Sequence, residues 1–283
     1  MTFMKAESGL KRKGCLHREP GGDMSEFTIT NDAVTLSVST KASEIHAFHK
    51  NGGREWMWQG DPEFWSGRNP TLFPLVGSTY DKKLHIDGKT YAIGNHGFAR
   101  HSEFTGSKLD DATIEMVLRD SEETLDQYPF HFELKNSYHL SGSTVTITTT
   151  VRNTGDVDLP FGLGYHPAFN VPDFDRYVIR CKAKGVEDKV ILLDREALEK
   201  TIILDQPVYT DYELSDGTEG LSVHAEGYPW VAFWSPRAPF VCIEPWYTHT
   251  DLEKVDVPFE KREGIRKLAP GASWASVYSI SLL

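Results

Sequence analysis

Apolar and polar residues alternate along most of this chain from about residue 24 onward. The pattern is clearest in FHFELKNSYHLSGSTVTITTTVRNTG, where two alternating segments flank a turn at Ser141-Gly142. The residues that share one face within each segment are Phe132, Leu134, Asn136, Tyr138 and Leu140, then Val145, Ile147, Thr149 and Val151. A period of two on both sides of a short turn that contains glycine predicts a β-hairpin.

Similar short runs recur along the chain, separated by turn clusters such as NGGRE, HIDGKT, LSDGTEG and LAPGAS. The runs are Phe27–Ser39, Ala112–Leu118, Tyr177–Cys181, Leu221–His224, Trp230–Trp234, Phe240–Ile243 and Trp274–Ile280. Helical periodicity is scarce; SEETLDQYP predicts a helical turn that ends before Pro129. Many strands with few short helices predict an all-β fold, a large antiparallel β-sandwich.

The first 23 residues differ from the rest in composition. They carry five Lys or Arg and three Asp or Glu, and they lack the continuous apolar centre of a secretory signal. We expect residues 1–23 to be a poorly ordered extension and residues 24–283 to form a single β-sandwich domain. The remaining chain shows no internal repeat, low-complexity tract or linker.

The charge balance and the cysteines narrow the range of partners. The chain has 30 Lys and Arg against 41 Asp and Glu, a net charge of −11, which disfavours binding to a phosphate backbone. No apolar run approaches membrane-spanning length. Three widely spaced cysteines without a CxxC motif indicate free thiols in a reducing compartment. We therefore expect a cytoplasmic protein with no nucleic-acid or membrane partner, either monomeric or dimeric.

Four segments place a charged or titratable residue among small and apolar neighbours. They are GLGYHPAFN with His166, WSGRNPTLFPLVG with Arg68, GNHGFARHSEF with His96, and APFVCIEPWY with Glu244. Burying a carboxylate on an apolar strand is costly unless it is paired, and burial raises its pKa, which suits a general base. Histidine exchanges protons near neutral pH. Spacing alone does not bring these four residues together.

Six segments in the same order make the chain similar to a known family. They are WQGDPEFWSGRNPTLFPLVG, HGFARHSEF, EETLDQYPFHFEL, GYHPAFNVP, WSPRAPFVCIEPWY and EGIRKLAPGASW. Together they resemble the aldose 1-epimerase (galactose mutarotase-like) family, in particular its LacX-like branch of shorter bacterial homologues. The resemblance extends from about Met24 to Leu283.

The resemblance implies a galactose mutarotase-like supersandwich with a sugar-binding cleft and a monosaccharide substrate. It implies that His166 is the general acid and Glu244 the general base of a mutarotase, which interconverts the α and β anomers of a sugar. Arg68 and His96 resemble residues that hold the sugar hydroxyls and ring oxygen. This chemistry needs no metal, nucleotide or redox cofactor.

One feature of the family has no unique counterpart in this sequence. Members with mutarotase activity also carry an aspartate that binds a sugar hydroxyl, from a loop between the histidine and glutamate segments. In this chain that region contains Asp205, Asp211 and Asp216. Trp65 and Trp234 are candidates for stacking on a sugar face, as is Trp246. The sequence does not name the sugar.

A zinc site and a glycosidase site fit the sequence less well. The histidine pairs His96/His101 and His131/His139 do not match the spacing of zinc ligands. A glycosidase would need a second carboxylate as partner to Glu244.

Two further alternatives keep the same cleft. A non-catalytic carbohydrate-binding protein would retain the aromatic residues without turnover. A hexose-6-phosphate 1-epimerase would bind the phosphate through extra basic residues, for which Arg100 and Arg237 are candidates.

Overall fold

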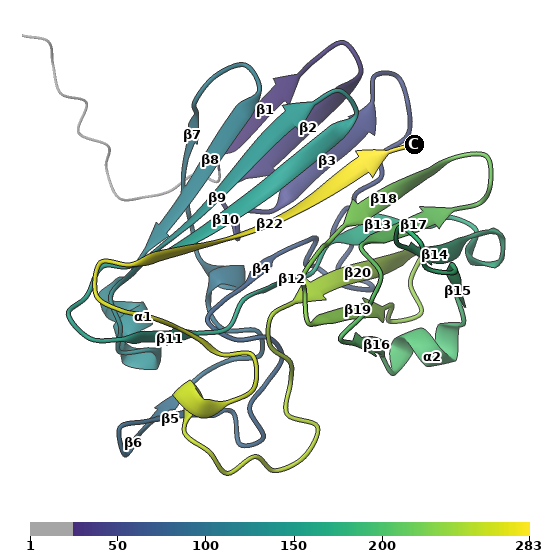
Figure 1. Cartoon of the computed structure of the whole chain (residues 1–283). Helices are drawn as coiled ribbons and strands as arrows, with labels where there is room; N and C mark the ends of the chain where they lie inside the picture. The colour runs from purple at the N-terminus through teal and green to yellow at the C-terminus, as the bar shows by residue number, and fades with distance from the viewer. Residues whose placement is uncertain (1–24) are drawn as a thin grey trace, which may run out of the picture.

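A computed structural model describes residues 25–283 of the chain, so the expectation for residues 1–23 lies outside the described residues. Its largest element is a nine-stranded antiparallel sheet (Figure 1). In spatial order its strands are β15 (Lys189–Leu192), β14 (Val178–Lys182), β17 (Asp211–Ser215), β18 (Gly220–His224), β22 (Ser273–Leu282), β10 (Thr144–Asn153), β9 (Phe132–Ser141), β8 (Thr113–Arg119) and β7 (Thr105–Lys108).

The predicted hairpin lies in the middle of this sheet. β9 and β10 pair in antiparallel register from Phe132 with Asn153 to Ser141 with Thr144. The face predicted to be apolar is buried along both strands. The hairpin prediction is therefore confirmed.

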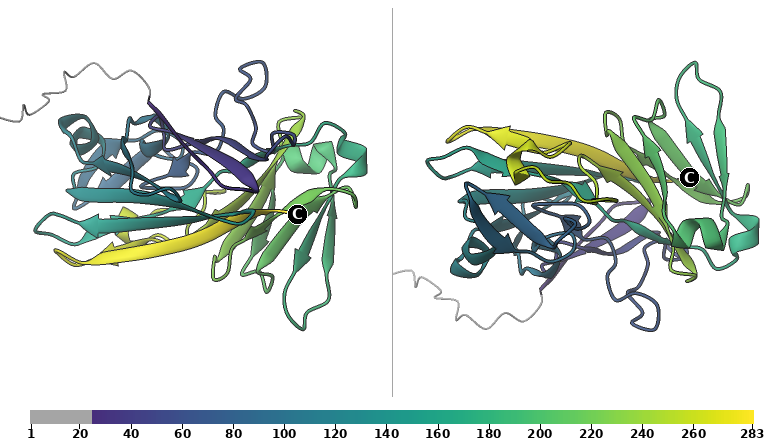
Figure 2. Two further views of the ribbon diagram at one scale, coloured as in Figure 1. Left: turned by 90° about the horizontal axis from the view of Figure 1, so that it is seen from above. Right: turned by 90° about the horizontal axis from the view of Figure 1, so that it is seen from below.

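Two further sheets pack against this one and share its core. The first consists of β1 (Glu26–Thr30), β2 (Val34–Ser39) and β3 (Ile45–Lys50). The second, which carries the candidate site, consists of β16 (Ile202–Asp205), β19 (Trp230–Trp234), β20 (Phe240–Trp246), β12 (Gly164–Tyr165) and β4 (Thr71–Leu72), with β13 (Ala168–Asn170) also paired to β20. Figure 2 shows β1–β3, in purple, to one side of the long strands.

The predicted run Phe27–Ser39 forms two strands rather than one. The side chain of Asn31 accepts hydrogen bonds from the backbone N–H groups of Ala33 and Val34, at 2.8 and 2.9 Å. This local bonding closes a turn between β1 and β2. Two short antiparallel pairs complete the strands: the hairpin of β5 (Lys83–Ile86) with β6 (Lys89–Ala92), and the long-range pair of β11 (Leu159–Phe161) with β21 (Arg266–Leu268).

Helices are few and short, as expected for this class. α1 (Glu122–Gln127) confirms the predicted helical turn, and Ser121 caps its first turn. α2 (Arg195–Glu199) is too short to leave a periodic signal in the sequence. The 3₁₀ helices are Ala99–His101, Phe174–Arg176 and Phe259–Lys261. Within residues 25–283, no helix is long and apolar enough to cross a membrane.

A buried polar ladder ties the sheets together inside the apolar core. Asn136 of β9 donates through Nδ2 to Ser43 Oγ at 3.0 Å and to Thr71 Oγ1 at 2.9 Å. Its Oδ1 accepts from Thr149 Oγ1 at 2.7 Å. Because Thr71 belongs to β4, this ladder fixes one edge of the sheet that carries the candidate site.

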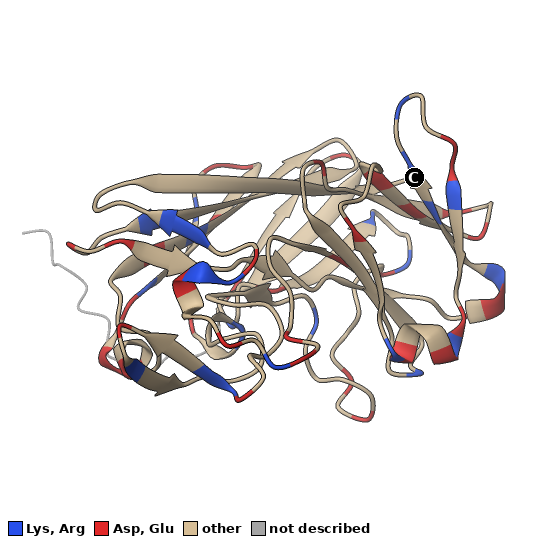
Figure 3. Ribbon diagram, turned by 60° about the horizontal axis from the view of Figure 1, so that its bottom comes forward, with Lys and Arg blue, Asp and Glu red and all other residues tan. Residues whose placement is uncertain are grey.

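Charged residues lie mainly at the periphery of the ribbon. Figure 3 shows acidic and basic positions interspersed over the loops and short helices in that view. With a net charge of −11, this distribution offers no positive stripe there.

Candidate active site

Glu244 lies in a strand whose seven residues are all buried. Its side chain is 1% exposed, and its neighbour across the sheet in β19 is Ala232. Because side chains alternate along a strand, Cys242, Glu244 and Trp246 project from the same face of β20. Burial raises the pKa of Glu244 well above its usual value, although the Trp246 indole and the charge of Arg100 act in the opposite direction. Burial thus favours the protonated form of Glu244.

Strand register places His166 directly opposite this carboxyl group. The pairs on either side of it are Gly164 with Trp246 and Ala168 with Cys242. The same antiparallel register puts His166 across from Glu244, with both side chains on one face. Gly164 lets Val76 and Trp246 pack closely next to the pair, because a Cβ there would lie 2.6 Å from Val76 Cγ2 and 2.8 Å from Trp246 Cδ1.

The two side chains form a buried acid–base pair. His166 Nε2 and Glu244 Oε2 are 3.4 Å apart, and His166 is 6% exposed. Burial lowers the pKa of His166 well below its usual value, with smaller contributions from His96 and Arg100. His166 Nδ1 and Glu244 Oε2 are buried without a hydrogen-bond partner among the described residues. Unpartnered polar atoms are costly, so they mark a place where a ligand can supply the missing bonds.

Aromatic rings fix the imidazole of His166 from two sides. Trp65 stacks on it with ring centroids 4.7 Å apart, and Trp234 meets it edge-on at 5.4 Å. Both tryptophans also pack on Phe240 of β20. The ring of His166 therefore has little freedom to rotate.

His96 is held in one tautomer by the loop opposite. Its Nδ1 accepts a hydrogen bond from the backbone N–H of Gly77 at 2.9 Å, and the backbone N–H of His96 donates to the Gly77 carbonyl at 2.7 Å. Burial, aided by the charge of Arg100, lowers the pKa of His96 to about 3. The neutral ring therefore carries its proton on Nε2 and can only donate from that atom. Its ring centroid lies 5.5 Å from that of His166.

These residues line one pocket of about 430 Å³. The lining consists of Trp65, Val76, Gly77, Asn95, His96, Arg100, His166, Thr201, Trp234, Glu244, Trp246 and Thr250. The structure thus brings together three of the four sequence-predicted site residues, His96, His166 and Glu244. The predicted stacking tryptophans line the pocket as well.

Arg68 is the predicted residue that does not reach this lining. Its guanidinium Nη1 donates instead to Gln59 Oε1 at 3.3 Å and to the His46 carbonyl at 3.5 Å. Its main chain does contribute to the site, because the Arg68 carbonyl accepts from the N–H of Ala168, the first residue of β13. Glu44 Oε1 in turn accepts from the N–H of Arg68 at 2.7 Å.

Arg100 supplies the positive charge that we expected from Arg68. It lies in the 3₁₀ helix Ala99–His101, lines the pocket, and influences the pKa of both histidines and of Glu244. The sequence marked Arg100 as a phosphate-binding candidate, and its place in HGFAR, four residues after His96, was the available signal. The other phosphate candidate, Arg237, is paired with Glu199 at 2.7 Å outside the lining.

None of the candidate aspartates reaches the pocket lining. Asp205 ends β16, Asp211 pairs with His224 at 2.9 Å, and Asp216 pairs with Arg176 at 2.9 Å. Of the described residues that line the pocket, Glu244 alone has a carboxyl group. Polar groups from loops, rather than a second carboxylate, complete the site.

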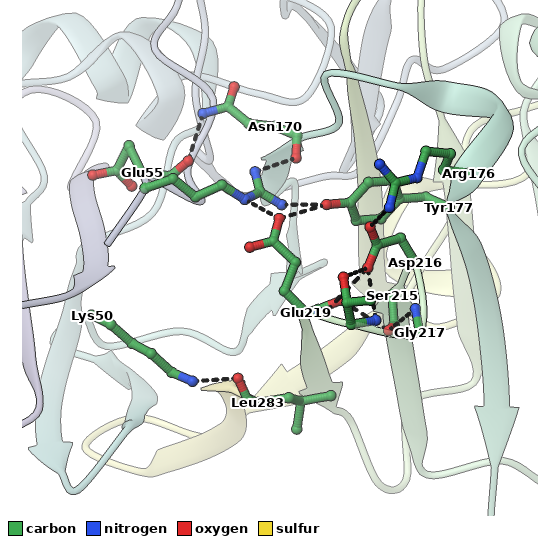
Figure 4. Close-up of polar contacts among 12 residues, drawn as sticks. Lys50, Glu55, Asn170, Arg176, Tyr177, Ser215, Asp216, Gly217, Glu219 and Leu283 are labelled. Carbon is green, nitrogen blue, oxygen red and sulfur yellow. Dashed lines mark hydrogen bonds and ion pairs between the residues drawn. The ribbon is translucent and has the colours of Figure 1, made fainter. Parts of the chain in front are cut away.

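Hydrogen bonds at Asn170, the last residue of β13, fix the end of the segment that carries His166. Asn170 donates through Nδ2 to the Met57 carbonyl at 2.7 Å, and its own carbonyl accepts from Arg54 Nη1 at 3.2 Å. Arg54 also donates to the hydroxyl of Tyr177 and pairs with Glu219 at 2.6 Å. Figure 4 shows Asn170, Tyr177 and Glu219 converging in this network, which anchors the end of β13.

Known proteins match the chain over nearly all of the described residues. A sequence model of the family described as aldose 1-epimerase matches residues 25–281. The LacX protein of Lactococcus lactis subsp. lactis, in its plasmid form, is 26% identical, and the match covers 90% of this chain and 98% of LacX.

Solved structures confirm the predicted fold family. A galactose mutarotase related enzyme from Lactobacillus acidophilus is 28% identical with a TM-score of 0.84, covering 92% of this chain and 97% of that one. A galactose mutarotase-like protein from Lactobacillus casei is 25% identical with a TM-score of 0.82, covering 92% and 100%.

Proposed function

Because the chain belongs to the aldose 1-epimerase family, we propose that it interconverts the α and β anomers of a monosaccharide by acid–base opening and closure of the sugar ring. The observation that carries the proposal is the buried acid–base pair of His166 and Glu244, 3.4 Å apart in a pocket. Its unpartnered atoms, His166 Nδ1 and Glu244 Oε2, support a polar ligand in that position.

Ring opening requires two proton transfers on the same sugar. One proton leaves the hydroxyl on C1 while another reaches the ring oxygen, and the C1–O bond within the ring breaks to give the free aldehyde. Rotation about C1–C2 and the reverse transfers then close the ring on the other face. In this site Glu244 takes the first proton and His166 gives the second.

The pair holds one proton in total, and its two tautomers serve the two halves of the reaction. Ionised Glu244 with protonated His166 opens the ring, and the transfers leave protonated Glu244 with neutral His166. That second state is favoured by burial in the free site, and it is the one that closes the ring on the aldehyde. The proton moves between the two groups across the 3.4 Å contact when a cyclic sugar binds.

Two donors stabilise negative charge that develops on the sugar oxygens. His96 offers Nε2–H from a fixed tautomer, and Arg100 offers its guanidinium from the edge of the pocket. Preorganised donors of this kind typically contribute ~10²–10³ in rate. We assign this role to Arg100 rather than to the guanidinium of Arg68.

The test is an exchange screen by NMR or polarimetry over free hexoses, pentoses and hexose 6-phosphates. We expect the wild-type protein to accelerate anomer exchange of at least one sugar. Glu244→Gln should lower the rate on that sugar by ~10²–10⁴ while binding changes little, because the amide keeps the shape but loses the basicity. If no sugar binds, or if Glu244→Gln exchanges anomers at the wild-type rate, the proposal is wrong. Binding without exchange would indicate the carbohydrate-binding alternative.

Arg100 favours a phosphorylated hexose as the second candidate substrate. Arg100 lines the pocket, and burial favours the neutral form of the one carboxyl group of the described lining. Arg100 therefore brings a positive charge to the pocket despite the net charge of the chain. A preference for hexose 6-phosphates that Arg100→Gln abolishes would establish this candidate; equal rates on free hexoses would refute it.

A further inference from the structure

The acid–base pair has a third metal-ligating group beside it. The ligand atoms of His166, Cys242 and Glu244 all lie within 4.8 Å of one another, and all three residues are buried. Of the described residues, this group alone has three or more His, Cys, Asp or Glu side chains close enough to hold one ion. Neither histidine pair considered from the sequence, His96/His101 or His131/His139, belongs to this group.

Strand geometry explains why the three groups meet. Cys242 and Glu244 are two residues apart on β20 and therefore share a face, and the register described above brings His166 to that face. Cys242 is absent from the pocket lining and fully buried, so its thiol lies beside the pair but away from the pocket surface. An ion that enters through the pocket would meet His166 and Glu244 first.

The distances suit a zinc ion. The 3.4 Å between His166 Nε2 and Glu244 Oε2 matches the ~3.4 Å that separates two ligand atoms ~2.1 Å from a tetrahedral centre. In a tetrahedral zinc site the sulfur lies ~3.6 Å from the other ligand atoms, so the Cys242 thiol, at up to 4.8 Å, must approach the pair by up to ~1 Å when the ion binds.

Charge and ligand type point to the same class of ion. A thiolate and a carboxylate together cancel the two positive charges of Zn²⁺, so the occupied site adds no net charge beside Arg100. A set of one sulfur, one imidazole nitrogen and one carboxylate oxygen favours thiophilic ions such as Zn²⁺ and Cd²⁺ over Mg²⁺ or Ca²⁺. Glu244 Oε2, buried without a hydrogen-bond partner, is an independent sign that a ligand is missing here.

We propose that His166, Cys242 and Glu244 form an inhibitory zinc site, in which a thiophilic divalent cation displaces the protons of the acid–base pair and excludes the sugar. Binding releases the proton of the Cys242 thiol and that of Glu244 to solvent, and the fourth position of the ion faces the pocket. The metal is a competitor here and not a cofactor. A three-ligand site with an open position is the arrangement of accessible zinc sites in other proteins.

The test follows Cd²⁺ binding through the ultraviolet charge-transfer band of the cadmium–thiolate bond. It uses the full chain with Cys15→Ser, so that Cys181 and Cys242 are the remaining thiols. Cys181→Ser is the matched control, because Cys181 is also fully buried but lies on β14. We expect the band in the parent and in Cys181→Ser, and we expect Cys242→Ser to lose it.

A second measurement records Zn²⁺ affinity by competition with a chromophoric chelator. Loss of a direct ligand should weaken binding by at least ~100-fold in Cys242→Ser and in Glu244→Gln, since even indirect partners of a metal are worth ~10–100-fold. Because neither readout uses sugar turnover, the result stands whether or not the proposed function does. A parent protein with no cadmium–thiolate band, or a Glu244→Gln variant with parental Zn²⁺ affinity, would overturn the proposal.

Discussion

Replacing Glu244 with glutamine should stabilise the folded protein at neutral pH while it removes the proposed activity. Glu244 is 1% exposed and its Oε2 has no hydrogen-bond partner among the described residues. Burial raises the pKa of this carboxyl group, so the folded protein favours its protonated form more strongly than the unfolded chain does. Glutamine has nearly the same shape and no such penalty.

The pH dependence of the effect follows from the raised pKa. Folding stability from this group is fully present below the ordinary carboxyl pKa and is lost as pH rises toward the folded-state pKa. At pH 7 the loss is limited to about 3.5 kcal/mol, the cost of holding a carboxyl group protonated ~2.5 pH units above its ordinary pKa. We therefore expect the free energy of unfolding of Glu244→Gln to exceed that of the wild type by ~1–3 kcal/mol at pH 7 and to equal it closely at pH 4.5.

The assay is urea unfolding of both proteins at half-unit steps between pH 4.5 and 8, with Glu226→Gln as the control. Glu226 is exposed in the turn before β19, so its replacement should leave the unfolding free energy unchanged throughout. If the unfolding free energies of Glu244→Gln and the wild type agree at every pH, or if their difference grows on acidification, Glu244 is ionised in the folded protein. The proton assignment of the pair would then be wrong.

Three further predictions concern the pocket. Arg100→Ala should lower the exchange rate by ~10²-fold, whereas Arg68→Ala should change it by less than ~2-fold, measured as kcat on the best sugar of the screen. Gly77→Ala should destabilise the fold by ~1–3 kcal/mol in urea unfolding and release His96, because the new Cβ would lie 2.3 Å from Thr250 Cβ. The profile of kcat/KM against pH should be a broad bell. Its acid limb lies below the ordinary histidine pKa, where His166 and Glu244 are both protonated and cannot accept a proton. Its alkaline limb lies above the ordinary carboxyl pKa, where neither residue has a proton to donate.

The alternation in the sequence was enough to predict the architecture, but not which arginine enters the pocket. Strand faces follow from a period of two, which is why the hairpin of β9 and β10 appears as expected. Arg68 and Arg100 both lie outside strands, where side-chain direction depends on the loop. The N–H of Arg68 is bound by Glu44 and its guanidinium turns toward Gln59, whereas Arg100 projects from a 3₁₀ turn into the pocket. No pattern in the sequence encodes that difference.

The prolines after His166 and Glu244 favour a local backbone conformation that can be expected from the sequence, but they do not determine that the two side chains meet. The predicted run ends at Ile243, whereas the structure continues β20 to Trp246, with Pro245, which lacks an N–H, opposite Val231. A residue before proline is driven to extended backbone, and His166 and Glu244 each precede one. Extended conformation at both positions allows the antiparallel register to carry them face to face, and that register is set by pairing between segments far apart in the chain. Each proline thus favours the local geometry of one catalytic candidate, while their meeting at 3.4 Å depends on the sheet as a whole.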